Sequence, residues 1–156
     1  MELSETTINI LLGILIAGVL VANIFFRRRK MEKAPVGKVT FMLIELDSNY
    51  KLTESFSFHR GVRRFKTGSW KRNKNKLDFL PMELRDMVAQ AFEMSEEVNE
   101  RIDAARKFGS DSYMAGIDVG KLKGPIDKSR QDLRAWLQEN MDNPEYAPPK
   151  RRGLFG

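Results

Sequence analysis

The sequence contains no cysteine and only one histidine among its 156 residues. Without cysteine, a disulfide framework, a thiolate metal site and a cysteine nucleophile are excluded. A single histidine leaves little room for the usual zinc and di-iron sites, which draw on several histidine or cysteine ligands. That residue, His59, has no acidic neighbour in the sequence closer than Glu54, and we interpret it as structural or solvated.

Common catalytic and nucleotide-binding motifs are also missing. The sequence has no P-loop, no G-x-S-x-G elbow and no G-x-G-x-x-G fingerprint. We therefore assign no catalytic, metal-binding or cofactor-binding residue, and we do not expect an enzyme.

Charge is distributed in blocks along a chain whose formal net charge is +6. Residues 27–30 are four consecutive cations, and residues 60–76 hold eight Lys or Arg and no acid. Residues 77–145 hold fifteen acids and nine bases, a net charge of −6, and three more cations follow at 150–152. Such blocks bear on partners and orientation rather than on the fold.

Residues 8–26 are a run of nineteen residues without a charge. As a helix this run would span about 28 Å, close to the hydrocarbon thickness of a bilayer. A cleaved signal peptide would have a basic segment before a shorter apolar run, whereas here Glu2 and Glu5 precede the run and the cations follow it. We predict a permanent transmembrane helix, a signal-anchor, at 8–26.

The flanking charges predict the orientation of this anchor. Lysine and arginine next to a membrane span are retained in the cytoplasm, and residues 1–7 have neither. We expect residues 1–7 outside a cell membrane and the basic linker 27–35 inside, followed by a cytoplasmic domain. The linker cations would also face anionic lipid headgroups, each interaction being worth about 1 kcal/mol; they are Arg27, Arg28, Arg29 and Lys30.

The segment 36–58 has two competing periodicities. With period 3.6, a stripe forms from Val39, Met42, Leu43, Leu46, Tyr50, Thr53 and Ser57. With period 2, Leu52, Phe56 and Phe58 alternate with polar residues, which would make 38–58 a β-hairpin. The helix is favoured because Pro35 and Gly61 bracket it and no glycine occupies the expected turn.

Two further helices are predicted downstream. The first runs between Pro81 and Gly109, with an apolar stripe of Leu84, Val88, Ala91, Ser95, Val98, Ile102 and Ala105. The second has a stripe of Leu122, Ile126, Ser129, Leu133, Trp136, Leu137 and Met141. Either it starts at Pro125 or a longer helix kinks there.

These elements predict a mostly α fold for residues 36–142, as a small antiparallel bundle or helical hairpin. The alternative is an α+β domain with the hairpin at 38–58. Residues 143–156 are rich in proline and cations, and we expect a disordered basic tail.

The basic block 60–76 is read as a loop with one or two anchoring aromatics. Its candidate contact residues are Arg60, Arg63, Arg64, Phe65, Lys66, Trp70, Lys71, Arg72, Lys74 and Lys76. Cations interleaved with aromatics suit anionic lipid headgroups, and also nucleic acid, which we favour less. Alternatively, the cations are solvated or pair with the acidic region, while the rings enter the core.

The sequence therefore predicts a single-pass membrane protein whose cytoplasmic helical domain serves as an interaction or scaffolding module near the bilayer. Its expected partners are the lipid bilayer and an unidentified protein or a second copy of the chain. The alternative is a membrane-associated binder of nucleic acid or anionic lipid that uses the loop 60–76.

Overall fold

The structure is a computed structural model that describes residues 18, 21–22, 31, 33–59 and 61–148. Most of the predicted anchor, the cations 27–30, Arg60 and the end of the tail lie outside these residues. Within the described part of the chain, no helix combines the length and the apolar character needed to cross a bilayer.

The ambiguous segment is a helix, α2, which runs from Pro35 to Glu54. No strand occurs among the described residues, so the hairpin alternative at 38–58 is wrong. Proline fits the first turn because its missing N–H has no intrahelical partner there. Residues spaced three or four apart form the buried face: Val36, Val39, Met42, Leu46 and Asn49. The alternation of Leu52, Phe56 and Phe58 instead spans the end of the helix and the loop after it.

Helices α4 (Met82–Phe108) and α5 (Val119–Asn140) confirm the other two helical predictions. All seven stripe residues predicted for α4 are buried. The helix ends at Gly109, whose φ of 64° lies in the left-handed region that glycine adopts most readily. Helix α5 begins six residues before Pro125, at an N-cap formed by Asp118, so the alternative start at Pro125 is wrong.

The predicted loop between α2 and α4 is partly helical. It contains α3 (Gly68–Asn73) and the 3-10 turn η1 (Lys74–Lys76). Helix α3 is capped by a residue of another helix. The carboxylate of Glu45 on α2 accepts hydrogen bonds from the Ser69 N–H, at 2.8 and 2.9 Å, and from the Ser69 hydroxyl. A cap supplied from a distant helix cannot be read from local sequence pattern.

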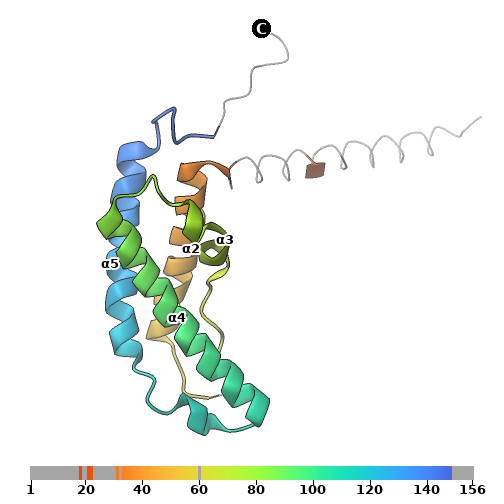
Figure 1. The fold of residues 1–156 in the computed structure, drawn as a ribbon. Coiled ribbons are helices and arrows are strands. Elements are labelled where there is room, and N and C mark those ends of the chain that lie inside the picture. Colours follow the sequence, from red (N-terminus) through yellow and green to blue (C-terminus); the bar gives the residue numbers. More distant parts are fainter. Residues whose placement is uncertain (1–17, 19–20, 23–30, 32, 60, 149–156) are drawn as a thin grey trace, which may run out of the picture.

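Helix α5 is the central element, because it packs against both α2 and α4. It runs antiparallel to both, whereas α2 and α4 run in the same direction (Figure 1). Residues 55–81, which we call the crossover, therefore carry the chain back along the length of α2. The turn from α4 to α5 contains η2 (Asp111–Met114).

Residues 143–148, the described part of the predicted tail, contact the helices. The backbone carbonyl of Tyr146 accepts a hydrogen bond from the Val36 N–H at 3.2 Å. Its ring lies 5.5 Å from the Trp136 ring and 6.2 Å from the Phe79 ring, measured between centroids. One aromatic side chain thus holds residues 143–148 against the bundle, although their composition is typical of disorder.

Candidate functional site

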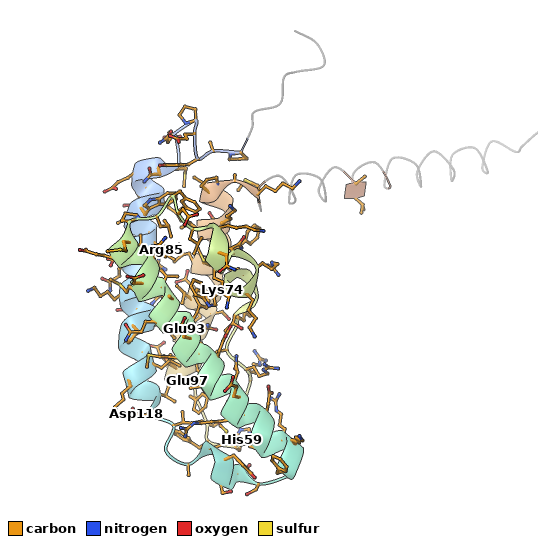
Figure 2. The ribbon with its side chains drawn as sticks, in the orientation of Figure 1. His59, Lys74, Arg85, Glu93, Glu97 and Asp118 are labelled. Atoms are coloured by element: carbon orange, nitrogen blue, oxygen red, sulfur yellow. The ribbon has the colours of Figure 1, made fainter. Side chains whose placement is uncertain are left out.

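The fold divides the basic block into two groups. Lys71, Arg72, Lys74 and Lys76 lie on α3 and η1, toward the end of the bundle where α2 begins. Residues 61–67 begin with a turn and continue without a helix or a strand, and this segment holds the other described cations. Figure 2 places His59, which precedes this segment, near the lower end of the bundle and Lys74 well above it.

The two aromatic residues of the block belong to the core. Phe65 is 3% exposed and Trp70 is 4% exposed. The Phe65 ring stacks on the Phe56 ring, with 5.9 Å between their centroids. The Trp70 ring lies parallel to the Phe92 ring, with 5.4 Å between their centroids. Neither ring is exposed for stacking on a ligand, so the exposed cations of the block that the structure describes are not interleaved with exposed aromatic rings.

Two buried asparagines hold the backbone of residues 65 and 66 between α2 and α4. Asn99 accepts from the Phe65 N–H at 2.8 Å and donates to the Phe65 carbonyl at 2.9 Å. Asn49 does the same for Lys66, at 2.7 and 2.8 Å. The Phe65 backbone is thus bound from α4 and the Lys66 backbone from α2, and each asparagine side chain pairs with both the N–H and the C=O of one residue.

A pocket of about 490 Å³ lies between the C-terminal half of α2 and the crossover. Its lining includes four cations, one histidine and three hydroxyls, but no carboxylate. The lining residues are Ser48, Asn49, Lys51, Leu52, Ser55, Ser57, His59, Gly61, Val62, Arg63, Arg64 and Lys66. The predicted contact residues Arg63, Arg64 and Lys66 are therefore brought together here, while those on α3 and η1 are not part of this pocket.

The acids of α2 do not enter the pocket lining because each is bound elsewhere. Glu45 caps α3. Asp47 accepts from Arg130 and Arg134 on α5, at 2.6 Å in both cases. Glu54 pairs with Lys123 at 3.3 Å, and that hydrogen bond raises the pKa of Lys123. The α2 wall of the pocket consequently has Lys51 as its only charge.

The pocket cations are only partly neutralised by the protein. Arg64 pairs with Asp103 on α4 at 3.2 Å. Within the described part of the chain, Lys51, Arg63 and Lys66 have no ion-pair partner. Outside the pocket, Lys71 lies 3.6 Å from Glu96. Pairing with the acidic region therefore accounts for two cations of the basic block.

The pocket also contains uncharged hydrogen-bond donors. The Nδ1 of His59 accepts a hydrogen bond from the Gly61 N–H at 3.0 Å, so Nε2 is the ring nitrogen left for a ligand. Ser48 and Ser57 add hydroxyl groups to the lining.

Sequence reasoning missed the α2 side of the pocket. Ser48, Lys51 and Ser55 are spaced three and four apart, which places them on one face of a helix. The helix predicted for this segment already implies that the three residues share one face. It carries little information by itself, because polar residues on an exposed helical face are common.

Outside the pocket, Lys38 and Lys76 lie close together near the beginning of α2. The Nζ of Lys38 is 3.5 Å from the Lys76 carbonyl oxygen and 5.6 Å from the centre of the Phe79 ring. Burial lowers the pKa of Lys38, and the neighbouring Lys76 ammonium lowers it further.

Comparisons of the chain with protein-family models, with curated proteins and with solved structures gave no match. The feature of the described residues that bears on function is the pocket, a concave site with cations on two walls, hydroxyl donors and no acid in its lining.

Proposed function

We propose that the chain is a single-pass membrane protein whose cytoplasmic helical domain is a binding module for anionic ligands. The anchor is residues 8–26, with residues 1–7 outside, and the four cations at 27–30 keep the domain on the cytoplasmic side. The ligand binds in the pocket between the C-terminal half of α2 and the crossover.

The observation that carries this proposal is the charge of the pocket lining. Four cations and no carboxylate come together from two segments of the chain. Three of the cations lack an ion-pair partner among the described residues. A concave site lined by one sign of charge focuses the electrostatic potential and attracts ligands of the opposite sign.

Binding fits the pocket better than catalysis. General acid–base chemistry needs a group that takes up a proton near the reacting atoms, most often a histidine or a carboxylate, and the lining has one histidine and no carboxylate. The hydroxyls and cations are donors, which are suited to holding an anion in place.

The binding proposal is tested with the full chain in nanodiscs of neutral phosphatidylcholine, titrated calorimetrically with inorganic pyrophosphate. We expect binding that weakens as salt is raised, because exposed charges are screened. A variant with Lys51→Gln and Lys66→Gln should bind at least about 10-fold more weakly, which corresponds to about 1.4 kcal/mol. Absence of binding by the parent chain at low salt would contradict the proposal.

The topology is tested separately by adding protease to sealed cells. We expect the domain to be protected until the membrane is permeabilised, because the cations 27–30 remain inside. Digestion of the C-terminal part in intact cells would refute the orientation while leaving the binding measurement unaffected.

Self-association is a second candidate, favoured by aromatic side chains at the end of the bundle where α2 and α4 finish. Phe58 is 57% exposed and Phe108 is 59% exposed, and Phe108 stacks on the half-exposed Tyr113 at 5.3 Å. Exposed aromatic residues are typical of interfaces. Sedimentation of the full chain in detergent tests this candidate: an oligomer that Phe108→Ser dissociates supports it, and a monomer rejects it.

A further inference from the structure

We infer that the ligand of the pocket is a compact molecule with two or more phosphate groups, either soluble or the headgroup of a lipid, rather than a nucleic acid strand. This inference rests on the proposed function and specifies the ligand class. It follows from the size of the pocket, the number of unpaired cations and the placement of the aromatic rings.

The size of the pocket suits a small molecule. Its volume of about 490 Å³ falls within the range of about 300–1,000 Å³ found for small-ligand sites. A single-stranded nucleic acid is bound along a basic groove in which successive bases stack on aromatic side chains. The two rings within the basic block are both buried, and the cations on α3 and η1 do not line the pocket.

The charge of the pocket indicates more than one phosphate. Arg64 forms an ion pair with Asp103. Among the described residues, this leaves Lys51, Arg63 and Lys66 as the three pocket cations without an ion-pair partner. One phosphate monoester carries a charge of about −1.5 to −2 at neutral pH. Two such groups supply about −3 to −4, which matches the three cations.

The arrangement of the walls also favours two phosphates. Lys51 belongs to α2, whereas Arg63 and Lys66 belong to the crossover, so the cations approach from two different segments. A ligand with phosphate groups at two positions contacts both segments at once. The hydroxyls of Ser48 and Ser57 provide neutral donors for its remaining oxygens.

The crossover wall is already held in place before a ligand binds. Asn49 and Asn99 fix the backbone of Phe65 and Lys66 through four hydrogen bonds. A wall that does not have to be ordered on binding leaves more of the interaction energy for affinity and for discrimination between ligands.

The test compares three probes in calorimetric titrations of the full chain in neutral nanodiscs at one ionic strength. The probes are orthophosphate, inositol 1,4,5-trisphosphate and a 12-nucleotide single strand. We expect the trisphosphate to bind at least about 10-fold more tightly than either of the others, because only it is both compact and multiply phosphorylated.

Residues 51–76 supply a charge-matched pair of variants for the same titrations. The pocket variant combines Lys51→Gln, Arg63→Gln and Lys66→Gln, and the control combines Arg72→Gln, Lys74→Gln and Lys76→Gln. Both remove three charges from exposed positions, and circular dichroism checks that both remain folded. The pocket variant should lose at least 10-fold in trisphosphate affinity, whereas the control should change less than about twofold.

Each outcome bears on a different claim. Equal losses in the two variants would overturn the pocket as the binding site, because the control cations do not line it. A strand that binds as tightly as the trisphosphate would overturn the ligand class but leave anion binding intact. If none of the probes binds the parent chain, the proposed function itself fails. A bisphosphorylated lipid in the nanodiscs distinguishes the sources: if it competes with the soluble trisphosphate, the ligand is a headgroup, and if it does not, the ligand is soluble.

Discussion

Replacing Asn99 by alanine should destabilise the domain more than most single substitutions do. Its side chain is 3% exposed and bonds both backbone groups of Phe65, at 2.8 and 2.9 Å. Alanine leaves a buried N–H and a buried C=O without partners. Each unsatisfied buried group costs about 1–3 kcal/mol, so we expect a loss of about 2–6 kcal/mol. That is a large part of the total stability of about 5–15 kcal/mol for a domain of this size.

The corresponding change at Asn49 should have a smaller effect. Asn49 makes equivalent bonds to Lys66, but these bonds are only partly buried and Asn49 itself lines the pocket. Water from the pocket can replace the lost amide, because a bridging water is nearly as favourable as a direct hydrogen bond. We therefore expect a loss of about 1–2 kcal/mol for Asn49→Ala.

Urea unfolding of the full chain in detergent, followed by far-UV circular dichroism, measures these differences. The control is Asn75→Ala, which makes the same chemical change at an exposed position of η1 in the crossover. Hydrogen exchange at the Phe65 amide gives a local readout, since loss of its acceptor should accelerate exchange. An Asn99→Ala variant within about 0.5 kcal/mol of the control would refute the argument, because surface substitutions fall in that range.

Three further predictions concern single side chains. Glu45→Gln should reduce the stability by about 1–2 kcal/mol in the same unfolding assay, because it weakens the cap on the Ser69 N–H; no change would show that α3 does not depend on this cap. Gly109→Ala should cost about 1–2 kcal/mol by urea unfolding, since φ at this position is 64°; an unchanged midpoint would contradict this. Lys76→Gln should raise the pKa of Lys38 toward its ordinary value, because it removes a repelling ammonium; NMR titration of the lysine Nζ measures this, and a constant or lower pKa would refute it.

The helices were predictable wherever an apolar stripe, a start signal and a stop signal agree. In α4, the buried stripe from Leu84 to Ala105 lies between Pro81 and Gly109 as predicted. In α2, the two periodicities overlapped near its end, because Leu52 belongs to the helix and Phe56 to the loop that follows it. Tertiary packing decided which period applies, as it commonly does for ambiguous segments.

The crossover was the least predictable part, because its structure depends on contacts distant in sequence. Asn99 lies 34 residues from its partner Phe65, and Glu45 lies 24 residues from its partner Ser69. The sequence around Asn99 and around Glu45 has no local pattern that predicts these hydrogen bonds. The sequence therefore predicts only a loop for the block 60–76, and it gives no sign that the fold divides the cations of the block into two groups.

The electrostatics of the pocket follow from where α5 places its cations. Asp47 is bound by Arg130 and Arg134, and Glu54 by Lys123, so both acids face α5. Without these contacts the two carboxylates would be free to turn toward Lys51 on the same helix. Substituting Arg130 and Arg134 should then weaken anion binding although neither residue lines the pocket, because an acid released near a cationic site lowers its attraction for anions. The cationic character of the pocket thus depends on how α5 packs against α2. It cannot be predicted by counting the charges within residues 60–76.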